Sequence, residues 1–235
     1  MTDDLAGAPA LQVGAMQVPA VPTARSRAKA DRRATLLSAA ARLFAARGFD
    51  GVSIEDLGAA AGVSGPAVYR HFPSKQAVLG ALLVGVSERL LAGGREVVAE
   101  VRDPATTLRS LVRFHVDFAL AEPDVIRVQD RDRSSLSDAD GRAVRALQRT
   151  YVDLWVATLA RLRPEADASE LRIRALATFG LIKSTPHSAV PSGRSVPRAG
   201  VAQLLEDMAL AALGPAPLPA STPVRVIGSP DRPTT

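Results

Sequence analysis

Side chains that can contact nucleic acid are concentrated in residues 53–75. Within seven positions this stretch holds four of them: Tyr69, Arg70, His71 and Lys75. An arginine can donate two hydrogen bonds to the edge of a guanine, whereas lysine, histidine and hydroxyl groups meet phosphate oxygens. The chemistry that this pattern favours is recognition of double-stranded DNA.

The charge distribution points in the same direction. Residues 23–82 contain nine lysines and arginines against four acidic residues, whereas the rest of the chain holds 20 of each sign. The whole net charge of +5 therefore lies in one quarter of the chain, as expected when only that quarter faces a polyanion. Taken alone, this charge excess is equally well explained by a solvated basic surface.

Two short helices are predicted on either side of Ala61–Gly62, where glycine permits a tight turn. Ser53 is a good N-cap, and Asp56 three positions later completes the pattern of a capping box. Ser64 caps the following helix, which cannot pass Pro73 because the residue before proline resists helical geometry. The crossing of the two helices is expected to bury Leu57, Val63, Val68 and Phe72.

An amphipathic helix is predicted immediately before this pair. It runs from about Asp31, a plausible N-cap, to Arg47, and Gly48 ends it. Its apolar stripe extends from Leu36 to Phe44 and supplies the third wall of a small core. Three helices in this order predict a helix-turn-helix unit.

The residues that form this unit resemble the tetracycline-repressor (TetR) family of regulators. The resemblance rests on Ala61-Gly62-Val63-Ser64 followed by Val68-Tyr69-Arg70-His71-Phe72-x-Ser74-Lys75, and on Arg42-Leu43-Phe44-x-x-Arg47-Gly48-Phe49 upstream. It covers about residues 31–82. Two positions depart from the family pattern. Gly58 replaces the usual alanine and is expected to loosen its helix by roughly 1 kcal/mol, and Gly65 stands where many members carry a longer base-contacting side chain.

The resemblance implies a role for each polar residue of the unit. Arg70 would contact a guanine, Tyr69 a phosphate or a thymine methyl group, and Pro66 and Ala67 thymine methyl groups. Phosphate contacts would come from His71, Lys75, Ser53 and Ser64. An N-terminal arm of Arg25, Arg27 and Lys29 would enter the neighbouring minor groove, although solvated charge is an equal alternative for it.

The rest of the chain also predicts helices and no strands, so the fold class is all-α. After a helix that Ser74 caps and that fades near Gly93–Gly94, helices are expected at about 104–121, 123–132, 138–163, 168–184 and 197–213. The expected organisation is a disordered tail at 1–22, a DNA-binding domain at 23–80, a ligand-binding and dimerisation domain at 81–213, and a second disordered tail at 214–235.

Family members hold a ligand between the helices of the C-terminal domain, so the resemblance implies a small-molecule effector. Polar and aromatic residues on the apolar faces are the candidates to line such a cavity: His115, Phe118, Gln129, Tyr151, Trp155 and Phe179. Lys183 lies on the same helix as Phe179. The alternative for each is ordinary core packing.

A homodimer is implied by the family's four-helix interface, made by two helices from each subunit. The candidate interface residues on the last two helices are Ala175, Phe179, Val201, Leu204, Leu205 and Met208. Two recognition helices would then read a near-palindromic site.

Other classes of function find little support. The chain has no cysteine, only three distant histidines, no phosphate-binding glycine loop and no metal-spaced cluster, so we expect no enzyme activity, cofactor or metal. No run of eighteen apolar residues suggests a membrane span, and a cytoplasmic location is expected. A protein that coats DNA without a ligand remains an alternative. The effector, the operator and the choice between repressor and activator are not encoded in any recognisable pattern.

Overall fold

The computed structural model describes residues 23–188 and 197–214, and all regular structure within them is helical. The predicted tail at 1–22, the predicted tail at 214–235 apart from Gly214, and most of the loop expected between the last two helices lie outside the described residues. The helices are α1 (Ala24–Arg47), α2 (Ile54–Ala60), α3 (Gly65–Val68), α4 (Lys75–Glu100), α5 (Pro104–Ala121), α6 (Pro123–Asp132), the short 3-10 helix η1 (Arg133–Ser135), α7 (Asp138–Leu162), α8 (Ala168–Ser188) and α9 (Arg198–Leu213).

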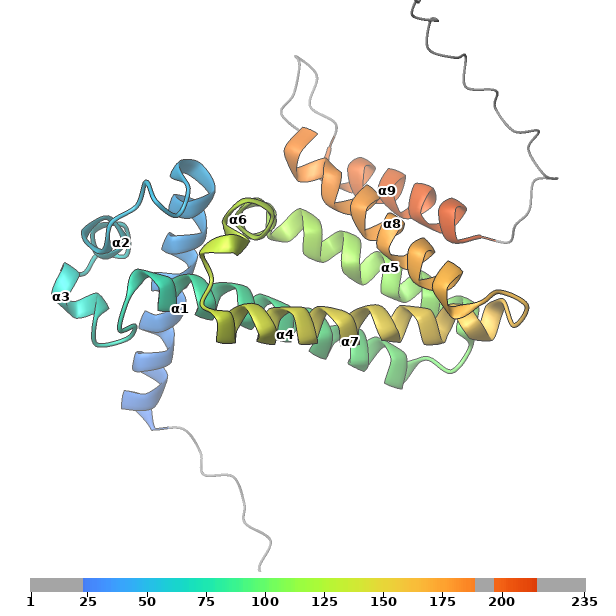
Figure 1. Ribbon diagram of the computed structural model, residues 1–235, viewed down its shortest axis with the longest axis horizontal. Helices are drawn as coiled ribbons and strands as arrows, with labels where there is room; N and C mark the ends of the chain where they lie inside the picture. The colour runs from blue at the N-terminus through green and yellow to red at the C-terminus, as the bar shows by residue number, and fades with distance from the viewer. Residues whose placement is uncertain (1–22, 189–196, 215–235) are drawn as a thin grey trace, which may run out of the picture.

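The helices form a small head and a longer bundle (Figure 1). Helices α1, α2 and α3 make the head, and α4 runs from it into the bundle, where it packs along α7. Helices α5, α8 and α9 complete the bundle, and α6 lies across the junction, against α1. The boundary predicted near residue 80 therefore falls inside one continuous helix.

Local capping explains where several helices begin. The Ser53 hydroxyl accepts from the Asp56 N–H at 3.0 Å and the Asp56 carboxylate accepts from the Ser53 N–H at 2.9 Å, so the predicted capping box is confirmed. Ser74 caps α4 as predicted, accepting from the Ala77 N–H at 3.1 Å. Ser64 occupies the N-cap position of α3 without a side-chain hydrogen bond.

The predicted start of the first helix is wrong. Helix α1 begins at Ala24 and not near Asp31, because the Thr23 hydroxyl caps it by accepting from the Ser26 N–H at 3.2 Å. Alanine and arginine in the added turns have high helix propensity, so nothing in residues 24–31 opposes the extension. Arg25, Arg27 and Lys29, predicted to form an N-terminal arm, are therefore helical.

The Gly93–Gly94 pair is a packing position within a helix and not a helix end. Helix α4 continues past Gly93–Gly94 to Glu100, although the sequence predicted its end there. A Cβ atom on Gly93 would lie 2.3 Å from the Phe114 ring, and one on Gly94 would lie 2.6 Å from the Tyr151 ring. These glycines allow aromatic side chains of α5 and α7 to pack directly against the α4 backbone.

Gly58 has a similar explanation, because a neighbouring stretch of backbone approaches it closely. A Cβ atom at this position would lie 2.8 Å from the carbonyl oxygen of Val63, in the turn between α2 and α3. A backbone atom cannot easily move aside, so glycine lets the turn fold back onto α2. The Val63 N–H donates to the Gly58 carbonyl at 2.9 Å, which holds that close approach.

Two apolar cores meet along α4. The first fills the head and reaches Val125 and Val128 of α6 and Val144 of α7. It includes Leu57, Val68 and Phe72 as predicted, whereas Val63 is only partly buried. The second core fills the bundle around Trp155, which is fully buried. Because the first core includes α6, the head is packed onto the bundle rather than hinged freely from it.

Helix α8 continues to Ser188, four residues beyond its predicted end.

Helix α4 is unusually apolar. Among the described residues, it is long and apolar enough to cross a membrane by length and composition. More than half of that apolar window is buried inside the protein, which is typical of the core helix of a bundle.

Candidate nucleic-acid interface and effector cavity

The segment from α3 to the start of α4 separates inward-facing from outward-facing side chains. Val68 and Phe72 are buried in the head core, while Tyr69 is 54% exposed and Arg70 and Pro66 are exposed. Tyr69 is thus not a core aromatic. Ala67 is partly buried beside these residues.

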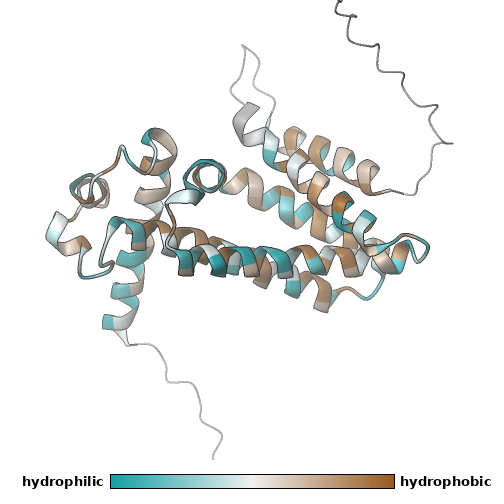
Figure 2. Cartoon of the chain, viewed as in Figure 1, coloured by the Kyte–Doolittle hydropathy of each residue, from teal (hydrophilic) through white to brown (hydrophobic). Residues whose placement is uncertain are grey.

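A basic hollow lies between α1 and this segment. Its volume is about 460 Å³, and the side chains that line it are almost all basic: Arg25, Ala28, Lys29, Arg32, Arg70 and His71. The exposed N-terminal half of α1 is hydrophilic along its length (Figure 2). Helix formation from Ala24 onward therefore gathers Arg25 and Lys29 beside Arg70, which an extended arm would not do. Arg27 does not line the hollow. Arg32 does, although it was not among the predicted DNA contacts.

Two predicted phosphate contacts instead make bonds within the head. The Lys75 ammonium donates to the Phe49 carbonyl at 2.8 Å and lies 4.3 Å from the centre of the Phe49 ring. The Ser53 hydroxyl donates to the Asp56 carboxylate at 2.7 Å, and its N–H is bonded to the same group. In this conformation Lys75 ties the start of α4 to the turn after α1, and Ser53 closes its capping box.

The bundle contains a cavity of about 280 Å³ between α4, α5, α6, α7 and α8. Five of the six residues predicted to line an effector site do line it: His115, Phe118, Gln129, Tyr151 and Phe179. Trp155 does not line it but packs edge-on against Phe179, with ring centres 4.8 Å apart. Other residues that were not predicted to line the cavity do line it, and they come largely from α4 and α8. Among them are Ser87, Leu176 and Lys183.

His115 is the polar centre of this cavity wall. Its ring stacks on Phe179 at 4.6 Å between centres, and its Nδ1 lies 3.2 Å from the Tyr151 hydroxyl. Burial, with a smaller effect from the Lys183 charge, lowers the pKa of His115 to about 3, so the imidazole is neutral at physiological pH. Burial also raises the pKa of Tyr151. The Nε2 atom of His115 is buried without a hydrogen-bond partner among the described residues.

Helix α6 connects this cavity to the head. Gln129 on α6 lines the cavity, and Arg131 two residues later reaches the C-terminal end of α1. The Arg131 guanidinium donates to the carbonyl oxygens of Phe44 and Ala45, and its Nε donates to the buried Asp132 carboxylate at 3.0 Å. A cation there also complements the negative end of the α1 dipole.

The exposed faces of α8 and α9 carry apolar side chains. Leu204 and Met208 on α9 are 58% and 46% exposed, and Ile173 and Leu176 on α8 are 67% and 50% exposed. Ala175, Phe179 and Leu205 were also predicted for a dimer interface, but they are buried in the subunit's own core. Val201 is partly buried. The predicted interface residues therefore come from both the inner and the outer faces of α8 and α9.

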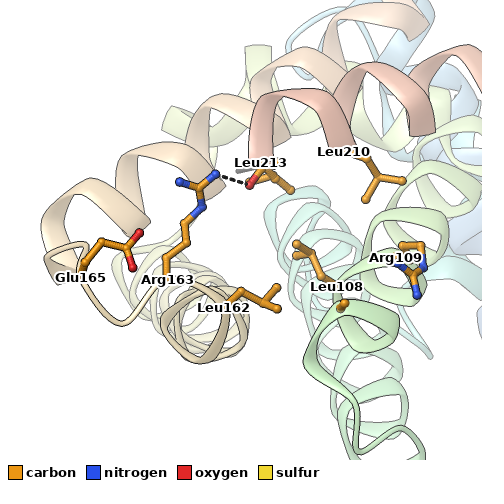
Figure 3. A pocket seen from close by; sticks show the side chains of 9 residues that line it. Leu108, Arg109, Leu162, Arg163, Glu165, Leu210 and Leu213 are labelled. Carbon is orange, nitrogen blue, oxygen red and sulfur yellow. Dashed lines mark hydrogen bonds between the residues drawn. The ribbon is translucent and has the colours of Figure 1, made fainter. Parts of the chain in front are cut away.

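A second hollow of about 380 Å³ lies at the end of the bundle away from the head. Four leucines from α5, α7 and α9 surround it, Leu108, Leu162, Leu210 and Leu213 (Figure 3). The buried Arg163 side chain beside it donates to the Leu213 carbonyl at 3.0 Å and so caps the end of α9. This hollow touches neither α6 nor the head.

Comparison with known families matches both parts of the chain. Residues 36–82 match a family described as bacterial regulatory proteins, tetR family. Residues 101–213 match a family described as tetracyclin repressor-like, C-terminal domain. The first match contains the helix-turn-helix, and the second contains α5 to α9.

Two of the similar proteins are transcription regulators by name. The HTH-type transcriptional repressor KstR2 of Rhodococcus jostii (strain RHA1) is 30% identical over 56% of this chain and 65% of its own length. The HTH-type transcriptional activator FasR of Mycolicibacterium smegmatis is 34% identical over 37% of this chain and 40% of its own length. The matched region thus spans less than two thirds of each of these two relatives.

Solved structures extend the likeness over most of the fold. A TetR-family transcriptional regulator from Bordetella parapertussis 12822 superposes with a TM-score of 0.67 at 26% identity, covering 76% of this chain and 93% of the other. The regulator PfmR from Thermus thermophilus superposes with a TM-score of 0.65 at 25% identity, covering 77% and 99%. With both parts of the chain matched and the whole helical arrangement shared, this protein belongs to the tetR family of bacterial regulatory proteins.

Proposed function

We propose that this protein is a cytoplasmic, dimeric transcription repressor that binds a near-palindromic operator and is released from it by a small molecule. The observation that carries the proposal is the basic hollow formed by α1 and the α3–α4 segment, with Tyr69 and Arg70 exposed beside it. A basic surface next to exposed side chains that can read bases is the arrangement expected for a DNA-reading head.

In the proposed complex with DNA, each exposed polar or basic residue of the head has its own contact. Arg70 contacts a guanine in the major groove, and Tyr69, Pro66 and Ala67 touch the backbone or thymine methyl groups. Arg25, Lys29 and Arg32 neutralise phosphates around the hollow, and His71 and the Ser64 hydroxyl, which makes no capping bond, donate hydrogen bonds to others. Arg27 adds positive charge on the same half of α1.

The dimer is supported by the apolar faces of α8 and α9. Four large apolar side chains exposed on two neighbouring helices favour burial against a second copy. Ile173 and Leu176 of α8 therefore replace Ala175, Phe179 and Leu205 in the proposed interface, and Leu204 and Met208 of α9 remain. One recognition segment contacts few base pairs, so two of them give the operator its length and symmetry.

Release by a ligand is supported by the position of α6. The cavity contains α6 side chains on one side, and Arg131 on the same helix holds the end of α1. A ligand that displaces α6 would move the head relative to the bundle and change the spacing of the two heads. The shift in DNA affinity then equals the difference in ligand affinity between the two arrangements.

The DNA-binding part of the proposal is tested with the full chain and a random duplex library. Selection of bound DNA is expected to yield a near-palindrome, and Arg70→Ala is expected to weaken binding to it by about 1–3 kcal/mol and to relax one base pair per half-site. Arg95→Ala, which removes an exposed arginine of the bundle, is the matched control and is expected to bind normally. Absence of binding to any duplex at low ionic strength would refute the proposal.

The coupling step has its own variant. Arg131→Met removes the bonds to Phe44 and Ala45 while keeping the side-chain length. We expect this variant to bind the operator but to respond less to an effector, measured by fluorescence anisotropy of labelled operator. A variant that is released as readily as the wild type would show that α6 acts through other contacts.

A further inference from the structure

The cavity in the bundle has a largely apolar lining, which includes Leu90, Phe118, Ile126 and Val152. His115 and Lys183 are the nitrogen bases in this lining, close enough for the Lys183 charge to affect His115, and we call them the polar corner. Uncharged polar groups are added to the lining by Ser87, Gln129, Gln148 and Tyr151. The volume of about 280 Å³ is at the small end of the range for ligand cavities, which favours a compact molecule over a long-chain one. A ligand that fits must therefore be mostly apolar and carry a polar group for this corner.

His115 restricts what that polar group can be. Its Nδ1 is occupied by the Tyr151 hydroxyl, and its buried Nε2 has no partner within the described part of the chain. A buried polar atom without a hydrogen bond is costly, so a ligand that supplies the missing partner gains that energy on binding. If the Tyr151 hydroxyl donates to Nδ1, the imidazole proton is on Nε2 and requires an acceptor.

Lys183 adds a positive charge beside that donor. Its side chain lies in the cavity wall, close enough for its charge to affect His115. Burial lowers the pKa of Lys183, the Asp130 carboxylate acts in the opposite direction, and Arg133 lowers it further. The surrounding groups therefore do not fully balance the positive charge of the Lys183 ammonium. An anion bound in the cavity would balance it.

From this arrangement we infer that the effector of the proposed regulator is a compact apolar molecule with a single carboxylate, which Lys183 and the Nε2–H of His115 bind together. The inference rests on the proposed function for its biological meaning, but the binding step is independent of DNA. A monovalent carboxylate matches one ammonium and one N–H donor, whereas a phosphate ester carries more charge than this corner supplies.

Ligand binding in the cavity can be measured through the fluorescence of Trp155. It is the only tryptophan in the chain, and its ring lies 5.9 Å from His115 and 4.8 Å from Phe179, measured between centres. The fluorescence of the full-length protein should therefore change when the cavity is filled. The probes are benzoate, cyclohexanecarboxylate, octanoate and 4-phenylbutyrate, each compared with its own primary amide and with phenylethyl phosphate.

We expect at least one acid to bind saturably and its amide to bind about 10- to 100-fold more weakly, because a charged hydrogen bond is replaced by a neutral one. Lys183→Met should lower the affinity for the acid to that of the amide and leave the amide unchanged. Arg172→Met, on the same helix but outside the cavity, is the control and should bind the acid normally. His115→Phe, which retains the stack on Phe179, should weaken the acid more than the amide.

Four results would each overturn the inference. They are equal affinity for acid and amide, unchanged acid binding in Lys183→Met, no saturable fluorescence change with any acid of the panel, and tighter binding of the phosphate ester than of the acids. If neutral compounds alone fill the cavity and release operator, the ligand class is wrong and the proposed function stands. If acids bind as expected but operator is never released, the ligand class stands and the proposed release step fails.

Discussion

Replacing Lys75 by methionine separates two roles that this residue can have. A phosphate contact would be lost without any effect on folding, whereas a tether within the head would be lost with a cost in stability. The structure favours the tether, because the Lys75 ammonium is bonded to the Phe49 carbonyl at 2.8 Å and lies 4.3 Å from the Phe49 ring. Methionine keeps the apolar stem of the side chain and removes only the charge and the donor.

The expected cost follows from these two contacts. A hydrogen bond from a charged group contributes about 1.5–3 kcal/mol and a partly exposed cation–π contact about 0.5–1 kcal/mol. Because Lys75 is only partly buried, we take the lower part of the combined range, about 2 kcal/mol, for Lys75→Met. With a urea dependence of about 2 kcal/mol per molar, the denaturation midpoint should fall by about 1 M.

The assay pairs urea denaturation, followed by circular dichroism, with the salt dependence of operator binding. Lys75→Met should lower the midpoint and leave the slope of log K against log [salt] unchanged, because no phosphate contact is lost. Arg70→Ala, an exposed residue at the recognition segment, should do the reverse. The reasoning is refuted if Lys75→Met keeps the wild-type midpoint and reduces the salt slope by about one phosphate contact.

Three further predictions follow from particular contacts. Gly58→Ala should destabilise the protein by about 1–3 kcal/mol because its Cβ would lie 2.8 Å from the Val63 carbonyl oxygen, whereas Gly65→Ala, whose Cβ would meet only the Glu55 side chain at 3.4 Å, should be nearly neutral in the same urea titration. Leu204→Glu should give a monomer in analytical ultracentrifugation at micromolar concentration and weaken operator binding, while Gln203→Glu adds the same charge at a neighbouring polar position and should stay dimeric; a dimeric Leu204→Glu would contradict the proposed interface. Because burial lowers the pKa of His115 to about 3, the unfolded chain binds a proton below pH 6.5 that the folded protein does not, so stability should fall by about 1.4 kcal/mol per pH unit between pH 6.5 and 3 from this residue; His115→Phe should remove that part of the slope, and equal slopes would show that His115 is not buried neutral.

Local signals carried much of the fold. The capping box of Ser53 and Asp56, the Ser74 cap and the glycine turn after α2 depend on residues within a few positions of one another, and the structure confirms each. The apolar stripes likewise located the helices of the head and the bundle. Five of the six predicted cavity residues line the cavity, because they share the inward faces of their helices.

Other features depend on contacts between distant parts of the chain. Lys75 bonds a carbonyl 26 residues earlier, and Arg131 bonds carbonyls 86 and 87 residues earlier, so no local pattern could assign their partners. The same holds for Gly93–Gly94, which resembles a helix end in sequence but fits aromatic rings from α5 and α7.

The sequence by itself determined the presence of the helices, the caps at Ser53 and Ser74, the position of the head and the charge that surrounds it, because hydrophobic period and capping act over one or two helical turns. Only the tertiary structure decided which side of α8 and of α9 is buried. Helices α8 and α9 have apolar residues on more than one face, and packing against the rest of the bundle left Leu204 and Met208 outside while it buried Ala175 and Leu205. Packing also brought His115 and Lys183 into one cavity wall, 68 positions apart in the sequence. Such pairings arise from the arrangement of whole helices, which no short stretch of residues specifies.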